Sequence, residues 1–279
     1  MWCSQEKTEL GLTEISRLTA INKSTVYKIL LSLQNHNLVH HAPVTKKYSL
    51  DYGVLKLSSI YLKHSDLRTA AHPFIEKLAD VSQKTITLAL RKEDHLVFID
   101  RVDGNNNVRF FCDIGKIAYY NSGAAAKAVF AFLPESEQKE IIKQPVYKFT
   151  TGTVSWEKLL EQAKVIRERG YFISDEEVDM GVYAIGVPIF NDHSEVVAGM
   201  AIAAVKSTLE KNEIEEMITL SKNTAKEISL RLCLHLLHKG KRPALRKEYL
   251  GFFAPAYCPV QHTAYKTHHI YGLQFLRLR

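Results

Sequence analysis

The hydrophobic positions at the start of the chain are spaced for two short helices. Over residues 13–18 the spacing predicts a first helix, with Thr13 as its N-terminal cap and with Ile15 and Leu18 turned inward. A tight connection then leads to a second helix, predicted over residues 23–34. The apolar residues of this second helix are spaced three and four positions apart, as one buried face requires: Val26, Ile29, Leu30 and Leu33.

The residues on either side of the second helix predict its cap and a hairpin behind it. Asn22 is suited to cap the N-terminus of the helix, since its side-chain oxygen can accept a bond from a free backbone N–H. Short strands are predicted over residues 38–41 and 47–50, joined through the turn residues 42–45. Helix, turn, helix and hairpin in this order is typical of a winged helix-turn-helix, which we assign to residues 1–50.

Beyond residue 50 the pattern predicts a linker and a second, larger domain. An amphipathic helix over residues 51–63 falls within a linker assigned to residues 51–66, and the larger domain is assigned to residues 67–238. Strands in meander order with helices grouped between them indicate an α+β domain built on an antiparallel sheet. The predicted strands are 85–90, 96–102, 108–113, 171–174, 183–190 and 196–204. The predicted helices are 67–81, 124–132, 135–143, 156–169 and 211–236.

Charge separates the end of the chain from the rest. The net charge is +7, yet residues 1–238 hold 29 basic and 29 acidic side chains, whereas residues 239–279 hold eight basic residues and one acid. Residues 239–279 follow neither a helical nor a strand period, so we expect them to belong to neither domain, as a read-through or shifted-frame extension. A basic tail that adds non-specific affinity for DNA is the alternative. Within the balanced part, residues 1–50 carry a local excess of three positive charges.

Several classes of protein are disfavoured by what the sequence lacks. The four cysteines stand singly and have no histidine at zinc-ligand spacing, so we expect no metal site and a reducing cytoplasm. No signal peptide or apolar run long enough to span a membrane is present, and a soluble protein without a membrane partner is expected. The G-x-S-x-G, Walker A, G-x-G-x-x-G and H-E-x-x-H motifs are also missing, so we expect neither an enzyme nor a bound cofactor.

The second helix of a helix-turn-helix enters the major groove, where its first residues meet bases and phosphates. In this chain the polar face of that helix is formed by Lys23, Ser24, Thr25, Tyr27 and Lys28. Lys46 and Lys47 follow at the tip of the hairpin, where a wing contacts the DNA backbone, and Thr13 at the start of the first helix completes the predicted interface. The alternative is that these residues form an ordinary solvated helix face.

Short motifs in both domains resemble the IclR family of bacterial transcriptional regulators. In the winged helix they are GLTEIS at 11–16, NKSTVYKIL at 22–30 and KYSL at 47–50. In the larger domain they follow in order at 67–79, 114–115, 126–134, 149–154, 167–171 and 175–190. The resemblance implies a GAF-like domain that binds a small effector, frequently a carboxylate or sugar acid. It further implies a homodimer or tetramer on a double-stranded DNA operator, with repression the commoner role.

The same resemblance implies an effector pocket made of seven residues: Ala124, Ala125, Ser174, Asp175, Ala184, Ala201 and Ala203. The backbone N–H groups of Ala124 and Ala125 would lie at a helix N-terminus, which suits an anion. Alanines stand where family members commonly carry hydroxyl or thiol groups, and Ala126 replaces a usual glycine, so a more apolar effector or weak binding is expected. Two alternatives stay open: the alanines are core packing residues, and the acidic run 175–177 is a solvated turn.

The resemblance also implies a helix before Gly11, and only ten residues precede that position. We therefore expect the first helix of the winged domain to be truncated. This departure keeps open a second functional hypothesis, a degraded regulator whose effector domain folds but whose DNA binding is weak or lost.

Overall fold

The computed structural model describes residues 8–63, 65–104 and 112–238, and the predicted tail 239–279 lies outside them. Residues 8–50 form a small unit with its own three-stranded antiparallel sheet in the order β1-β3-β2. Its elements are β1 (Leu10–Gly11), α1 (Leu12–Thr19), α2 (Lys23–Asn35), β2 (Val39–His41) and β3 (Lys47–Leu50). This is the predicted winged helix-turn-helix, with the additional short strand β1 beside β3.

Packing within the small unit confirms part of the predicted core and corrects the rest. Ile15, Val26 and Leu30 are buried, as predicted. Leu18 and Ile29 are instead 57% and 44% exposed, because within the described residues no further element covers their side of α1 and α2. The predicted cap of α1 is also wrong. Residue 11 precedes the helix as its N-cap without a side-chain bond, and Thr13 lies inside the first turn.

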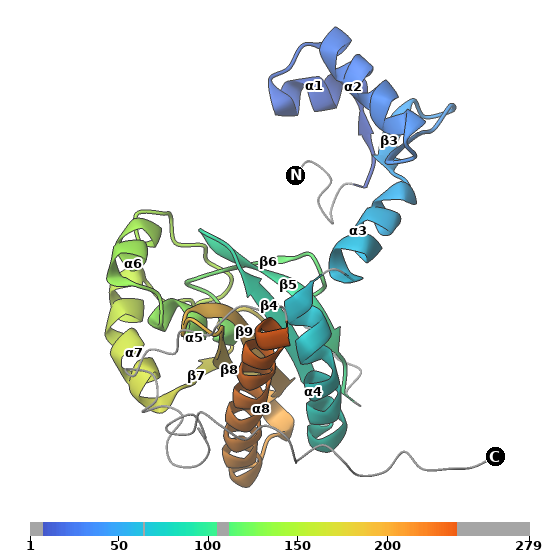
Figure 1. Cartoon of the computed structure of the whole chain (residues 1–279). Coiled ribbons are helices and arrows are strands. Elements are labelled where there is room, and N and C mark those ends of the chain that lie inside the picture. The colour runs from blue at the N-terminus through green and yellow to red at the C-terminus, as the bar shows by residue number, and fades with distance from the viewer. Residues whose placement is uncertain (1–7, 64, 105–111, 239–279) are drawn as a thin grey trace, which may run out of the picture.

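Helix α3 (Gly53–Lys63) joins the small unit to the larger one, and the small unit stands away from the main body in Figure 1. The helix begins at Gly53 where space is tight, since a Cβ there would lie 2.5 Å from the carbonyl oxygen of Asn37. The predicted apolar stripe is present but mostly uncovered: Leu55, Leu57 and Tyr61 are all more than half exposed, whereas Leu62 packs against a core of the larger unit. The linker therefore contributes an apolar surface of its own.

The larger unit is built on a six-stranded sheet in the order β6-β5-β4-β9-β8-β7, with every neighbouring pair antiparallel. The strands are β4 (Thr85–Arg91), β5 (His95–Val102), β6 (Ile117–Tyr119), β7 (Phe172–Asp175), β8 (Val182–Phe190) and β9 (Val196–Val205). The predicted α+β class with an antiparallel sheet is confirmed. Strand β9, an unbroken run of apolar residues, is buried along almost its whole length at the centre of the sheet.

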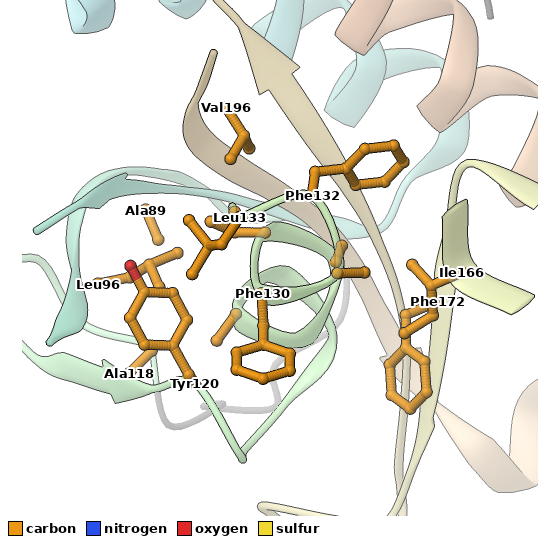
Figure 2. Close-up of a cluster of buried hydrophobic side chains, with 14 of the residues drawn as sticks. Ala89, Leu96, Ala118, Tyr120, Phe130, Phe132, Leu133, Ile166, Phe172 and Val196 are labelled. Atoms are coloured by element: carbon orange, nitrogen blue, oxygen red, sulfur yellow. The ribbon is translucent and has the colours of Figure 1, made fainter. Parts of the chain in front are cut away.

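Helices cover both faces of this sheet, and each face has its own apolar core (Figure 1). One face carries α4 (Asp66–Ser82) and α8 (Lys211–His238). The other carries α5 (Ala124–Ala131), α6 (Glu135–Ile141) and α7 (Trp156–Arg169), and a short 3₁₀ helix, η1 (Lys206–Thr208), follows β9. Figure 2 shows the second core, in which Phe130 of the buried helix α5 lies among Tyr120, Leu133 and other side chains. Helix α5 is thus held between the sheet and α7.

One predicted strand, over residues 108–113, has only its last two residues within the described part of the chain. These two, Cys112 and Asp113, are not in a strand. The edge strand beside β5 is β6, a few residues further along the chain. Its three residues give too short an alternation of polar and apolar positions to predict a strand.

An irregularity in β5 turns one buried carboxylate toward helix α4. The strand register passes from Phe98, opposite Ala89, to Asp100, opposite Leu88, so one extra residue is accommodated between them. Asp100 is only 1% exposed, and its carboxylate lies 3.1 Å from Nη2 of Arg68 and 2.7 Å from Nδ1 of His72, both on α4. This cluster ties the start of α4, just after the linker helix, to β5, the strand next to the edge strand β6.

Asp100→Asn is therefore expected to lower the free energy of unfolding by about 1–2 kcal/mol. The buried carboxylate loses its charge, while its two partners, Arg68 and His72, are partly solvated. Urea unfolding of the whole protein measures the change. Asp103→Asn is the matched control: its carboxylate pairs with Arg101 but is 58% exposed, so a change below about 0.5 kcal/mol is expected. Equal losses in the two variants would contradict the structural role of the Asp100 cluster.

Candidate nucleic-acid interface and ligand cavity

The N-terminal half of α2 presents a continuous polar surface to solvent. Its cap is the predicted one: Oδ1 of Asn22 accepts bonds from the backbone N–H of Thr25 at 3.0 Å and from the hydroxyl of Ser24 at 2.7 Å. This bond fixes the Ser24 side chain at the first turn of the helix. All five predicted α2 residues are exposed: Lys23, Ser24, Thr25, Tyr27 and Lys28. The opposite side of the helix is anchored in the small core through Val26 and Leu30.

The hairpin between β2 and β3 adds two cations beside this helix. Lys46 and Lys47 are both exposed, and the backbone N–H of Lys46 bonds to the carbonyl of Ala42 to close the turn. Lys46 adopts the left-handed conformation, with φ of 53°, which a tight turn needs and which is uncommon for a lysine. Thr13 is exposed as well, on α1. Every side chain predicted to contact DNA is thus exposed to solvent.

A cavity of about 90 Å³ lies between the sheet and the N-terminus of α5. Six of the seven residues predicted for an effector pocket line it: Ala124, Ala125, Ser174, Ala184, Ala201 and Ala203. The strand register explains why distant residues meet here, since Ser174, Ala184 and Ala203 are successive neighbours across β7, β8 and β9. Their small side chains leave the space open. Four of the alanines are buried and Ala184 is partly buried, as core packing residues would be, but all of them also border the cavity.

Helix α5 approaches the sheet closely, and two glycines leave the space for it: Gly186 of β8, and Gly199 of β9, where a Cβ would lie 2.6 Å from the carbonyl oxygen of Ala125. A Cβ at Gly186 of β8 would lie 2.1 Å from the main-chain carbon and oxygen of Ala124, far inside van der Waals contact. The close approach places the start of α5 at the cavity. Gly123, the N-cap, has no side chain to bond the first turn, so the backbone N–H groups there are available to a ligand.

The rest of the cavity lining is mostly apolar with a few polar groups. Phe98, Ile117, Phe149, Val178 and Val182 supply apolar walls. The polar residues at the cavity are Thr87, Ser122, Ser174, Glu177 and Asp179. Among the described residues, the hydroxyls of Thr87 and Ser174 have no hydrogen-bond partner, whereas Ser122 donates to the carbonyl of Tyr119. The cavity thus combines an apolar body with unpaired polar groups, as small-molecule sites do.

The acidic run 175–177 divides between the surface and the interior. Asp175 is exposed and does not line the cavity; its carboxylate lies 2.8 Å from Nζ of Lys206, and Glu176 bonds the same amine at 2.9 Å. These two side-chain bonds raise the pKa of Lys206 to about 12. For Glu177 the alternative of a solvated turn is wrong, because it is only 7% exposed and faces inward.

Glu177 pairs with a lysine that is completely buried. Nζ of Lys127, on α5, lies 2.6 Å from Oε1 of Glu177 and 4.8 Å from the centre of the Phe172 ring. Burial lowers the pKa of Lys127, and the attraction of Glu177 offsets this only in part. Hydroxyls hold the backbone around Glu177: Thr150 donates to the carbonyl of residue 176 at 2.7 Å, and Thr153 to that of residue 177 at 3.0 Å.

Several of these residues were missed by sequence reasoning. Thr87 lies within the mostly apolar strand β4, and nothing in the residues around it in sequence marks it as part of a site. In sequence Glu177 looks like the two acids before it, which pair with Lys206, and only tertiary packing turns Glu177 inward. The one available signal was Lys127, a lysine inside the apolar run 124–133, which requires a buried counter-charge.

Cys112 also lines the cavity, and burial raises the pKa of its thiol to about 11. At pH 7.5 only about one such thiol in three thousand is the reactive thiolate. We therefore expect iodoacetamide to label Cys112 at least about tenfold more slowly in the native protein than in urea. Mass spectrometry of the digested protein measures the two rates. Equal rates would contradict the burial of this thiol.

Neither a metal site nor a membrane-spanning helix is found in the described part of the chain. No group of three or more histidine, cysteine, aspartate or glutamate side chains there is placed to hold a metal ion. Among the helices of residues 8–63, 65–104 and 112–238, none is both long and apolar enough to cross a membrane.

Comparisons with known proteins match both units to domains of one family. Residues 4–43 match the family described as the IclR helix-turn-helix domain, and residues 59–230 match the bacterial transcriptional regulator IclR C-terminal domain. The chain is 31% identical over 232 residues to the HTH-type transcriptional regulator KdgR of Dickeya chrysanthemi, covering 82% of this chain and 76% of that protein. It is 25% identical over 233 residues to the transcriptional repressor IclR of Escherichia coli, covering 82% and 85%.

A solved structure is similar over both units as well. The crystal structure of the Thermotoga maritima IclR protein superposes with a TM-score of 0.65 at 29% identity, covering 80% of this chain and 91% of that one.

Proposed function

Because the chain belongs to the IclR family of bacterial transcriptional regulators, we propose that it represses transcription from an operator that it binds as a homodimer or tetramer. Members of this family are transcriptional regulators, not enzymes. We further propose that a small carboxylate or sugar acid binds the cavity and changes the affinity for DNA. On this proposal residues 1–50 contact DNA, residues 51–66 link the parts and residues 67–238 bind the effector.

The observation that carries the DNA-binding half of the proposal is the exposed polar face of α2. Ser24 and Thr25 stand at the start of the helix, with Lys28 about one turn further along. A recognition helix meets the major groove with these first turns, and short hydroxyls and lysines are suited to phosphates and base edges. Lys46 and Lys47 would contact the backbone beside the groove.

The effector half of the proposal rests on the cavity. It is small, enclosed largely by apolar side chains and bordered by the free N–H groups at the start of α5, an arrangement that favours a small anion with an apolar body. The alanines make the lining more apolar than hydroxyl or thiol groups would. Asp175, which faces Lys206, is the one predicted pocket residue for which the geometry offers no direct contact.

A fluorescence anisotropy titration tests the DNA-binding half. Labelled duplexes tiled across the region upstream of the gene are titrated with the full chain in the presence of excess unrelated DNA. We expect one pseudo-palindromic site to bind specifically, with half-sites about 34 Å apart on one face of the duplex. Binding that competes equally with every duplex would contradict the proposal and favour the degraded regulator.

A further inference from the structure

We propose that Glu177 accepts a hydrogen bond from the effector, so that the cavity selects a small hydroxy acid over the matching acid without the hydroxyl. This inference rests on the proposed role of the cavity as the effector site. It assigns to Glu177 the choice between ligands, a role separate from holding the carboxylate end.

The carboxylate of Glu177 has one engaged oxygen and one free oxygen. Oε1 accepts a bond from Nζ of Lys127 at 2.6 Å. Oε2 is buried and has no hydrogen-bond partner among the residues that the structure describes. The residue lines the cavity and is only 7% exposed, so bulk water cannot easily satisfy this oxygen. A buried acceptor without a donor is costly, and a ligand that supplies the donor removes that cost.

Other groups cannot easily turn to meet the free oxygen. Lys127 is completely buried, with its amine held between Oε1 and the Phe172 ring. The backbone of Glu177 is held by the hydroxyl of Thr153, which limits how far the carboxylate can move. No side chain among the described residues meets the free oxygen, so we expect its hydrogen-bond donor to come from a ligand in the cavity that Glu177 lines.

The remaining polar groups define the other end of the ligand. The N–H groups at the start of α5 favour a carboxylate, and the hydroxyls of Thr87 and Ser174 can each donate or accept. Between these groups the walls are alanine, phenylalanine and valine. A cavity of about 90 Å³ restricts the ligand to a small metabolite. A short-chain carboxylate with a hydroxyl directed at Glu177 satisfies each of these conditions.

Paired ligands test the inference on the full chain. Isothermal titration calorimetry compares lactate with propionate and 3-hydroxybutyrate with butyrate, which differ only in the hydroxyl. Of the two hydroxy acids, we expect the one that binds more tightly to bind at least about tenfold more tightly than the matching acid without a hydroxyl. The acid without a hydroxyl leaves Oε2 of Glu177 unpaired. In Glu177→Gln this preference should fall to about threefold or less, since the amide can no longer present two acceptor oxygens.

Two further variants make the result specific. Glu176→Gln, at the partly exposed neighbour that bonds Lys206, should keep the full preference. Should Glu177→Gln fail to fold because Lys127 is left with no counter-charge, the double variant Lys127→Met/Glu177→Met removes the pair together and should also lose the preference.

Each outcome decides one of the two claims. Equal binding of the paired acids, or a preference retained without Glu177, overturns the inference. Specific DNA binding without binding of either hydroxy acid also overturns it but leaves the DNA-binding function standing. Selective binding of a hydroxy acid by a protein that binds no operator supports the inference and counts against the proposed regulator.

Discussion

Gly186→Ala is expected to lower the free energy of unfolding of the larger unit by more than about 3 kcal/mol, which is above the usual cost of an extra methyl group in a core. The added Cβ would lie 2.1 Å from the carbonyl carbon and oxygen of Ala124 and 2.6 Å from the N–H nitrogen of Ala125. These are backbone atoms, so no side-chain rotation relieves the clash, and α5 must move away from the sheet. Urea unfolding of the full chain measures the loss.

The same substitution at Gly152 is the matched control. A Cβ there would meet nothing closer than 3.3 Å, so Gly152→Ala should change stability by less than about 1 kcal/mol. The displacement of α5 should also widen the cavity, so any Gly186→Ala protein that folds should bind a carboxylate ligand more weakly. Similar stability for both variants would show that the start of α5 does not depend on a glycine at position 186.

Replacement of Lys28, Lys46 and Lys47 by alanine in one variant is expected to weaken operator binding several hundredfold at about 0.1 M salt. All three amines are exposed on the proposed DNA-binding face. Each contact to a phosphate contributes about −0.9 to the slope of log affinity against log salt, so the triple alanine variant should reduce that slope by about 2.7. Anisotropy titrations between about 50 and 200 mM salt measure both quantities.

A control with the same loss of charge separates contact from long-range attraction. Lys139, Lys148 and Lys164 are exposed on or near α6 and α7 of the larger unit. Their replacement by alanine changes the net charge by the same amount, and it should leave the slope unchanged because these lysines touch no phosphate. If the two triple variants lose affinity equally, the lysines act through net charge alone and the α2 interface is wrong.

Local sequence signals predicted the elements of both units better than their contacts. The capping bond of Asn22, the strands of the central sheet and the apolar run of β9 follow from residue preference and spacing. Exposure of Leu18 and Ile29 could not be predicted in this way, because helical spacing identifies an apolar face but not the element that covers it. The edge strand β6 was missed because three residues carry too little pattern.

The candidate site shows the same division. Six of the seven residues that the resemblance implied for the pocket line one cavity, because the antiparallel register fixes which side chains of β7, β8 and β9 are neighbours. The resemblance could not separate Glu177 from Asp175, since adjacent acids look alike in sequence. Only the fold shows that one faces Lys206 at the surface and the other faces Lys127 in the interior.

Control of DNA affinity by the cavity is the central claim, and one titration tests it most directly. The full chain is titrated onto its labelled operator with and without a saturating hydroxy acid selected by calorimetry. We expect the dissociation constant to rise at least about fivefold with the acid present, as coupling between two sites of about 1–3 kcal/mol produces. An operator affinity that stays the same while the acid occupies the cavity would contradict the claim.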